Sequence, residues 1–403
     1  MKIILAFDSF KGSLSAEEAV RTASKGILTI MPDAEIIGLP LADGGEGFSE
    51  TLHLYTNAEK HYCKAHDALM REIEATYYIS QDGETAIIDM ASAAGLTLIE
   101  EDKRNPMFTT TYGVGEMILN AVNYGCKQIL LGIGGSATND GGIGMLAALG
   151  VSFFDKNGDT LPPIGKNLNE IARIDWSGLK ISNVTQNEDS EFVGQKPIRI
   201  TVACDVENPL FGTNGAAHVY ARQKGATEED VITLDNGLRH FSTLCHPIST
   251  NCNHNITPAT LPNLNPDSPG AGAAGGLGFG LMLLNAKLCK GYDIILDASD
   301  FEKHLVGTNL VLTGEGKTDC QTLQGKLPYG VLKRAKTANV PVIIVSGIVE
   351  NKEELIKAGF KDAVSINPPL LSVQDLHEAM KPENAMRTLA LPCQSLLSTS
   401  HNF

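Results

Sequence analysis

The chain has 403 residues, of which 43% are hydrophobic and 20% are charged, a composition typical of globular proteins. This length exceeds what one ordinary hydrophobic core holds, so we expect two domains. The formal net charge of −15 argues against nucleic acid or an anionic membrane as a partner, because both bind basic surfaces.

Alternating strands and helices are predicted at the start of the chain. Lys2–Phe7 is a short apolar run that predicts a buried strand, and Glu35–Leu39 predicts a second one. Between them, Ser15 and Glu18 have the spacing of a capping box, which predicts a helix over Ala16–Ile30. Apolar strands that alternate with helices indicate a parallel sheet.

A different pattern follows in the middle of the chain. Ile73–Ile79 and Glu84–Met90 alternate around a turn, as the strands of an antiparallel hairpin do. Tyr112–Tyr124 predicts a helix, and Gln128–Leu131 predicts a strand that leads into a glycine-rich loop. The run Ile143–Leu149 predicts a helix directly after that loop.

The strand–helix–strand pattern returns late in the chain, at Leu310–Thr313, Tyr329–Ala338 and Val342–Ser346. Two polar segments, Ser182–Pro197 and Ile248–Pro269, lack apolar periodicity, and we interpret them as mobile surface insertions. We therefore expect one α/β domain that is split by a mixed domain inserted in its middle.

The loop after Gln128–Leu131 carries the most chemical information. Its sequence, GIGGSATNDGG, crowds Ser, Thr, Asn and Asp among glycines. A strand, a glycine loop and a helix in this order aim backbone N–H groups at a phosphate. A tight turn packed on the sheet would explain the glycines but not the polar side chains. The candidate nucleotide-binding residues are Gly134, Gly135, Ser136, Thr138 and Asn139, and Asp140 is a candidate metal ligand.

Acids, glycines and lysines also follow the other predicted strands, where open parallel sheets bind their ligands. Asp8 and Lys11 follow the first strand, Asp43 follows the second, and Asp205 follows the apolar run Ile198–Ala203. The strand Leu310–Thr313 leads into a further group made of Gly314, Glu315, Gly316, Asp319 and Lys326. Any one of these loops could be solvated surface.

Taken together, these loops supply what phosphoryl transfer needs: amides and cations for phosphates, acids for Mg²⁺, and a carboxylate near the attacking hydroxyl. Neither the P-loop motif nor the motif set of protein kinases is present. Gly270–Gly275 matches G-x-G-x-x-G, so a dinucleotide-dependent oxidoreductase is an alternative. A polar loop rather than a strand precedes this match, which disfavours that alternative.

Several long motifs, in order along nearly the whole chain, resemble those of the type I glycerate kinases. They are AFDSFKGS at Ala6–Ser13, ADGGEG at Ala42–Gly47, GGSATNDGG at Gly134–Gly142, ACDVENPL at Ala203–Leu210, QKGAT at Gln223–Thr227, PGAGAAGGLG at Pro269–Gly278 and TGEGKTD at Thr313–Asp319. Phe48 stands where this family usually has Thr, and Lys317 where Arg is common.

The resemblance implies ATP- and Mg²⁺-dependent phosphorylation of D-glycerate to 2-phosphoglycerate, with 3-phosphoglycerate as the alternative product. It also implies an α/β fold in which a flavodoxin-like parallel-sheet domain is interrupted by a second α/β domain, with the active site in the cleft between them. We place the first domain at residues 1–68 and 292–403 and the inserted domain at 69–291. A non-catalytic sensor of glycerate or nucleotide would have lost the loop acids, which are present here.

The chemistry suggests a role for each candidate residue. Lys11 and Lys326 would neutralise the glycerate carboxylate or the γ-phosphate, since an acidic pocket alone would repel a small anion. Asp43 or Asp205 would orient the attacking hydroxyl. Asp140, Glu315 and Asp319 would hold Mg²⁺, while the phosphates would lie on Gly134, Gly135, Ser136, Thr138, Asn139, Gly314 and Gly316.

The sequence also predicts where the protein works. The apolar run at the N-terminus is too short for a signal peptide, and no stretch approaches the length of a membrane span. The 8 cysteines are scattered and include no C-x-x-C pair, which indicates reduced thiols. We expect a cytoplasmic enzyme, a monomer or homodimer, with D-glycerate and ATP as its partners and neither nucleic acid nor membrane.

Overall fold

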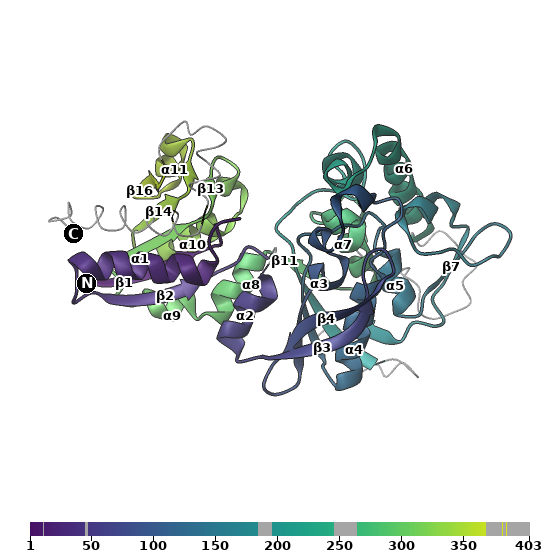
Figure 1. Ribbon diagram of the computed structural model, residues 1–403, viewed down its shortest axis with the longest axis horizontal. Helices are drawn as coiled ribbons and strands as arrows, with labels where there is room; N and C mark the ends of the chain where they lie inside the picture. The colour runs from purple at the N-terminus through teal and green to yellow at the C-terminus, as the bar shows by residue number, and fades with distance from the viewer. Residues whose placement is uncertain are drawn as a thin grey trace. The chain divides into compact units, whose positions relative to one another are not determined.

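The computed structural model describes residues 1–10, 12–44, 47–183, 196–245 and 264–367, together with 381 and 384. Its contacts divide the chain into two compact units (Figure 1). The first unit comprises Met1–Asp43 and Lys290–Phe403, and the second comprises Gly44–Cys289.

The unit boundary differs from the one expected from sequence. Residues 44–68 were expected in the first unit, but they lie in the second. The reason is strand pairing: β3 (Glu59–His66) runs antiparallel to β4 (Glu72–Ile79) along its whole length. The polar composition of β3 hides this pairing in the sequence.

The first unit contains a five-stranded parallel sheet. Its strand order is β16 (Asp362–Ser365), β14 (Val342–Ser346), β12 (Leu310–Gly314), β1 (Lys2–Phe7) and β2 (Glu35–Pro40). In chain order this is 2-1-3-4-5, the flavodoxin-like order, whose switch point lies between β1 and β12. The expected flavodoxin-like parallel sheet is therefore confirmed.

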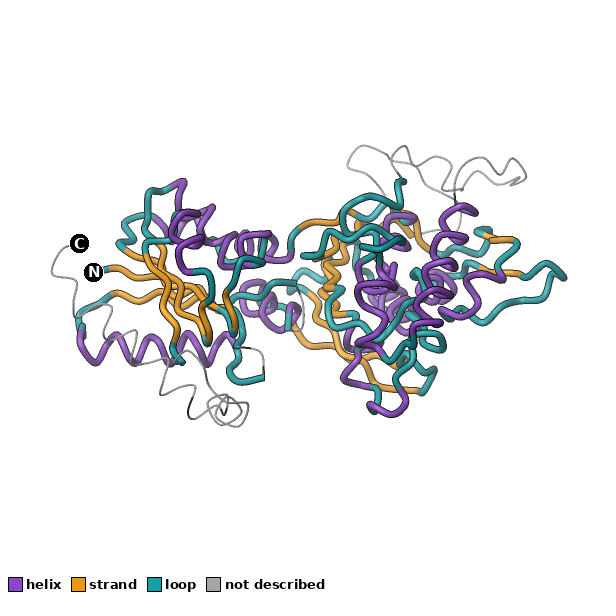
Figure 2. Tube along the Cα trace, turned by 90° about the horizontal axis from the view of Figure 1, so that it is seen from above, coloured by secondary structure: helices purple, strands orange, loops and turns teal. Residues whose placement is uncertain are grey.

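Helices lie on both faces of this sheet (Figure 2). Helix α1 (Ala16–Ile30) begins at the predicted capping box, in which Ser15 and Glu18 each accept a hydrogen bond from the other's backbone N–H. Its apolar side chains pack against Ile3, Leu5 and Phe7 of β1. Helix α10 (Leu327–Thr337) contacts β12 and β14. Among the described residues, the unit also has the α-helices α8 (Gly291–Ala298), α9 (Phe301–Leu305) and α11 (Lys352–Ala358). A small parallel pair joins β13 (Lys317–Thr318) to β15 (Ile348–Val349).

The second unit is built on a mixed sheet with the order β11-β10-β6-β5-β4-β3, to which β9 adds beside β10. Strands β5, β6, β10 and β11 are parallel, while β3 and β4 are antiparallel. The predicted hairpin is confirmed in β4 and β5. The other strands named here are β5 (Thr85–Asp89), β6 (Gln128–Gly132), β9 (Ile181–Asn183), β10 (Lys196–Ala203) and β11 (Lys287–Cys289). A separate antiparallel pair joins β7 (Ser152–Phe154) to β8 (Arg173–Asp175).

One large core holds the second unit together, and it includes apolar side chains of the sheet and of the helices around it. The helices are α2 (Phe48–Thr56), α3 (Ala91–Ala94), α4 (Tyr112–Tyr124), α5 (Ile143–Ala148), α6 (Glu228–Cys245) and α7 (Ala273–Leu283). Figure 1 shows α4 and α5 beside the sheet, and the two helices pack against each other. This packing fixes the glycine loop that connects β6 to α5.

The two expected insertions lie largely outside the described residues. The ends of Ser182–Pro197 are an exception, because β9 reaches Asn183 and β10 starts at Lys196, and these ends pair with each other. Of Ile248–Pro269, only the part from residue 264 onward is described. Among the described residues, no helix is long and apolar enough to cross a membrane.

Candidate active site

Two carboxylates lie at the switch point of the first unit. Asp8 directly follows β1, and Glu315 directly follows the neighbouring strand β12. The Asp8 backbone N–H donates to the Gly314 carbonyl at 3.0 Å, which continues the strand pairing to the edge of the sheet. In flavodoxin-like sheets, ligands bind at this point. Lys11, the other candidate beside β1, lies outside the described residues.

Glu315 is held by hydroxyl groups and a lysine. Its Oε1 accepts a hydrogen bond from the Thr322 hydroxyl at 2.7 Å, and its backbone N–H donates to Ser346 Oγ at 3.1 Å. Lys326 Nζ lies 3.6 Å from Oε2, and Lys326 is also the residue immediately before α10. The structure thus brings the two sequence candidates Glu315 and Lys326 together.

The other candidates beside β12 play different parts. Asp319 Oδ1 accepts from the Gln321 backbone N–H at 2.9 Å, and Lys317 Nζ lies 4.0 Å from Oδ2. Gly314 is buried, and a Cβ atom there would lie 1.9 Å from the Val345 carbonyl oxygen. The glycine is therefore required by packing between β12 and β14. Gly316, two residues further on, is half-buried and nearer the edge of the sheet.

Asp43 and Asp205 follow strands of different units. Asp43 comes after β2 of the first unit, and Asp205 comes after β10 of the second. Both side chains are half-buried at the carboxyl ends of parallel strands, as the sequence predicts. Each is therefore placed to meet a ligand at the carboxyl edge of its own sheet.

The glycine loop of the second unit has an exposed tip and a buried base. Gly134 and Gly135 are accessible at the tip, and Ser136 retains 9% of its surface. Gly135 has φ +70°, a conformation that suits glycine. Thr138 and Asn139 are fully buried, and their hydroxyl and amide atoms have no hydrogen-bond partner among the described residues. A ligand can therefore reach the tip without any movement, whereas the expected contacts with Thr138 and Asn139 require the loop to open.

Asp140 differs most from the expectation. It is fully buried, and its two carboxylate oxygens accept four hydrogen bonds, from the Thr111 backbone and hydroxyl and from the backbone N–H groups of Gly142 and Gly144. Burial raises the pKa of this carboxyl, while those donors lower it in part. With its oxygens engaged in this way, Asp140 does not fit a metal site, and it instead joins the loop to the start of α4.

Lys224 is a functional candidate that the sequence reading missed. It is buried beneath the glycine loop and donates to Ser136 Oγ at 2.8 Å and to the Thr138 carbonyl at 2.7 Å. Burial lowers the pKa of its ammonium group to about 7, although the nearby charge of Asp140 opposes this shift. Its motif, QKGAT, contains no local signal that the lysine points inward.

Asp89 is a second missed residue. It ends β5, at the same edge of the sheet as the glycine loop, and accepts hydrogen bonds from the Ser49 hydroxyl at 2.7 Å and from the Ser49 backbone N–H. A carboxylate beside the first turn of α2 is stabilised by the helix dipole. Asp89 therefore anchors the helix that follows the ADGGEG motif. An acid at the end of a predicted strand was the signal available in the sequence.

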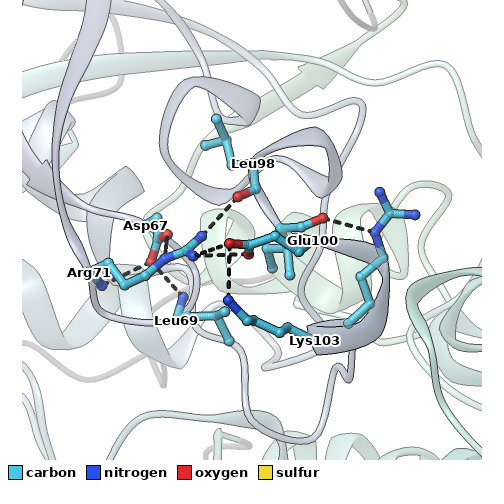
Figure 3. A network of polar contacts seen from close by, with 8 residues as sticks. Asp67, Leu69, Arg71, Leu98, Glu100 and Lys103 are labelled. Carbon is cyan, nitrogen blue, oxygen red and sulfur yellow. Dashed lines mark hydrogen bonds and ion pairs between the residues drawn. The ribbon is translucent and has the colours of Figure 1, made fainter.

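A surface network of hydrogen bonds and ion pairs stabilises residues 98–103, which precede the threonines that contact the glycine loop. Arg71 donates to Asp67, to the Leu98 carbonyl and to Glu100, and Lys103 pairs with Glu100 (Figure 3). These contacts connect the turn after β3 to residues 98–103. The chain then continues to Thr109 and Thr111, whose hydroxyls donate to the Ala137 carbonyl and to the Asp140 carboxylate of the glycine loop. We assign this network a structural role.

The G-x-G-x-x-G match at Gly270–Gly275 is explained by close packing. Ala274, Gly275 and Gly276 all have positive φ, so a left-handed turn precedes the right-handed part of α7. The Gly275 carbonyl accepts from the Gly141 N–H at 3.0 Å, and a Cβ atom on Gly275 would lie 2.0 Å from the Thr138 carbonyl oxygen. These glycines let the turn approach the glycine loop.

Among the described residues, no group of three or more His, Cys, Asp and Glu side chains could hold a metal ion unaided. Mg²⁺ in phosphate-transferring enzymes commonly uses one or two carboxylates together with substrate phosphates and water. Glu315 and Asp8, at adjacent strand ends, fit that pattern. A glycine loop and acids at the carboxyl ends of parallel strands are together typical of an α/β enzyme that handles phosphate groups.

Comparisons with known proteins agree with this class. The model of the glycerate kinase family matches residues 3–396. A glycerate kinase of Halalkalibacterium halodurans is 41% identical over 396 residues, which cover 96% of this chain and 97% of the relative. The glycerate 2-kinase of Escherichia coli K12 is 41% identical over 382 residues, covering 94% and 93%.

A solved structure gives the same result. The crystal structure from Salmonella typhimurium LT2 described as glycerate kinase 2 superposes with a TM-score of 0.77 at 36% identity, covering 99% of this chain and 98% of that one. The chain is thus a phosphotransferase by class. It belongs to the glycerate kinase family.

Proposed function

We propose that this enzyme transfers the γ-phosphoryl group of Mg²⁺-ATP to the 2-hydroxyl of D-glycerate, giving 2-phosphoglycerate and ADP. The observation that carries the proposal is the 41% identity to a glycerate 2-kinase across 94% of the chain. The two sheets support it, because each presents acids at the carboxyl ends of its parallel strands.

The nucleotide phosphates are proposed to bind at the exposed tip of the glycine loop. Gly134 and Gly135 let a phosphate approach the backbone closely, and the Ser136 hydroxyl supplies a donor. Gly316, beyond β12, is retained as a second phosphate contact. Thr138 and Asn139 remain candidates only if the loop opens, since both are fully buried.

Mg²⁺ is proposed to bind Glu315, with Asp319 or Asp8 as the second carboxylate. Bound there, the ion would neutralise charge on the phosphates during transfer. Glu315 currently faces the Lys326 ammonium, so its negative charge is already balanced by a cation. Asp140 is omitted from the proposed metal site because its oxygens are occupied by protein donors.

The acceptor needs a cation for its carboxylate and an acid for its hydroxyl. Lys326 and Lys11 are proposed to neutralise the glycerate carboxylate or the γ-phosphate. Asp43 or Asp205 is proposed to accept the hydroxyl proton as the new P–O bond forms. The assignment of these two acids stays a prediction.

Phosphorus NMR of a mixture of enzyme, Mg²⁺-ATP and D-glycerate tests the function. We expect the ATP signals to give way to those of ADP and 2-phosphoglycerate. Accumulation of 3-phosphoglycerate would overturn the assigned regiochemistry, and unchanged ATP while both ligands are bound would indicate a sensor.

A matched pair of variants tests the site. Lys326→Met removes the cation beside Glu315 and should lower kcat/KM at least tenfold, or about 1.4 kcal/mol of transition-state stabilisation. Lys333→Met removes an exposed lysine from the same helix and should leave the kinetics unchanged. Equal kinetics for the two variants would remove Lys326 from the site.

A further inference from the structure

A buried lysine lies directly beneath the exposed tip of the glycine loop. Lys224 Nζ is 2.8 Å from Ser136 Oγ and 2.7 Å from the Thr138 carbonyl oxygen, although it is 88 residues from Ser136 along the chain. Lys224 is 2% exposed, whereas Ser136 retains 9% of its surface. Ser136 therefore lies between the buried ammonium and the exposed Gly135 at the tip of the loop.

In its charged form, Lys224 fixes the direction of this hydrogen bond. An ammonium group has three donors and no acceptor, so Ser136 Oγ must accept from it. A serine hydroxyl has one proton of its own, and that proton must then point to another acceptor. Thr138 offers its carbonyl to the same ammonium, which holds Nζ in place from a second side.

We infer that Lys224 is a positioning residue that makes the Ser136 hydroxyl a fixed donor toward a phosphate oxygen of the nucleotide. The inference rests on the proposed function, because it takes the loop tip as the phosphate site. Lys224 contacts no ligand in this arrangement. It acts through Ser136, by orienting the hydroxyl and by placing positive charge behind it.

The charges around Lys224 favour such a role. In the part of the chain that the structure describes, the charged group that acts on Lys224 is Asp140, which lies at the buried base of the same loop. Gly225, the residue after Lys224, packs closely against the backbone of Arg104, since a Cβ atom on Gly225 would lie 2.0 Å from the Arg104 carbonyl oxygen. Burial disfavours the charged lysine, so an anion bound at Ser136 would stabilise the ammonium and in turn be held more tightly.

A second arrangement of the same atoms makes a different prediction. A neutral Lys224 amine could take the proton of Ser136, whose Oγ would then attack the γ-phosphorus and release ADP. The product would be phosphoserine at Ser136, detectable as label retained from γ-³²P-ATP in the absence of glycerate. Such stoichiometric labelling would overturn the positioning role, and unlabelled protein supports it.

A double-mutant cycle on ATP binding is the main test. We expect Lys224→Met and Ser136→Ala each to raise the Kd of ATP about tenfold. The double variant should bind ATP no more weakly than Ser136→Ala does. If the two fold-changes in Kd multiply in the double variant, Lys224 acts independently of Ser136, which would overturn the inference. Lys127→Met, which removes an exposed lysine of the same unit, should leave the Kd unchanged.

The kinetics separate this role from a general weakening of the structure. Lys224→Met should raise KM for ATP while KM for D-glycerate stays within twofold of wild type. Equal increases for both substrates would indicate a merely structural lysine. Because the cycle is measured on nucleotide binding, a wild-type protein that binds ATP but does not phosphorylate glycerate would contradict the proposed function and leave the cycle readable.

A further measurement covers the case in which Lys224→Met does not fold. In protein labelled with ¹⁵N-lysine, ATP should shift the Nζ resonance of the buried lysine in the wild type. The same titration of Ser136→Ala should leave this resonance in place at saturating ATP. A shift of equal size in both proteins would overturn the inference.

Discussion

At the scale of single residues, the same functional group, a carboxylate, serves different purposes in the two units. Glu315 lies at a sheet edge, bonded to hydroxyls and facing the Lys326 ammonium. Asp140 lies inside the second unit with both oxygens occupied. Glu315 is half-buried at the carboxyl edge of its sheet, whereas Asp140 is fully buried with both oxygens accepting hydrogen bonds, so burial rather than sequence context favours Glu315 as the proposed Mg²⁺ ligand.

Asp140→Asn should destabilise the protein without changing its need for Mg²⁺. Both oxygens of Asp140 accept hydrogen bonds, so an amide NH₂ in either orientation faces a donor. We expect a loss of about 3 kcal/mol in the free energy of unfolding, measured with urea. Asp319→Asn is the control, with a small stability change. A stable Asp140→Asn protein that requires far more Mg²⁺ would restore Asp140 as a metal ligand.

Lys224 should make stability depend on pH just above neutrality. Its pKa is lowered from 10.5 to about 7 on folding, so between these values the unfolded chain binds more protons than the folded one. Stability therefore rises with pH across this window, and the full penalty is present below it. From pH 7 to 8.5 we expect a gain on the order of 1–2 kcal/mol over Lys224→Met. Parallel pH profiles for the two proteins would contradict this.

The pH range is chosen to avoid other groups. Burial raises the pKa of Cys63 and Cys126 to about 11, from 9.0. Because these thiols stay protonated longer in the folded protein, the protein loses stability as pH rises above 9.0, their pKa in the unfolded chain. This change is opposite in direction to the one expected from Lys224. Below pH 8.5 their contribution is small, and the comparison with Lys224→Met removes what remains.

At the scale of secondary structure elements, one arginine connects three helices of the first unit. Arg334 of α10 pairs with Asp293 and Asp297 of α8 and with Glu302 of α9, at 2.5 to 2.8 Å. Its own side chain is 18% exposed, while the three acids are considerably more exposed. The planar guanidinium has five N–H donors in a fixed arrangement, so it can bond several carboxylates at once, whereas the three donors of an ammonium rotate freely.

Arg334→Met should loosen the packing of these three helices. Removing a partly buried cation leaves three acids close together without compensation, and we expect a loss of about 2 kcal/mol in the free energy of unfolding. Lys303→Met removes an exposed lysine of α9 that pairs with Asp300, and should cost well under 1 kcal/mol. Thermal and urea unfolding of both variants provide the comparison. Equal losses would assign Arg334 no special role.

At the scale of the whole molecule, the two units differ in how they use the chain. The second unit is one continuous segment, Gly44–Cys289, with its own core. In the first unit, β1 lies between β12 and β2, so its sheet needs residues from both ends of the chain. Continuity of the chain should therefore decide which unit folds alone.

A fragment of residues 44–289 should fold by itself. We expect a single cooperative urea transition and dispersed NMR signals, whereas a fragment of residues 1–43 should stay unfolded because it lacks β12 and β14. The 44–289 fragment should have no kinase activity, since Glu315 and Lys326 belong to the other unit. A molten 44–289 fragment would show that its core depends on the rest of the chain.

The sequence by itself determined the elements whose signals are local. The bounds of β1, α1 and α4 match those predicted, because an apolar run or a capping box lies within the element itself. The sequence also indicated the flavodoxin-like class, through a family resemblance that motifs of consecutive residues carry. The family follows from those motifs and the comparisons.

Only the tertiary structure decided which polar residues are accessible. Thr111 and Lys224 reach the glycine loop from 29 and 86 to 88 residues away, and such contacts leave no pattern in neighbouring residues. These contacts show that Asp140 connects the loop to Thr111 inside the unit, and they identify Lys224 as a candidate functional residue. Residues 44–68 belong to the second unit, not to the first as expected from sequence. The cause is again a tertiary contact, because β3 is stabilised by pairing with β4 rather than by its own composition.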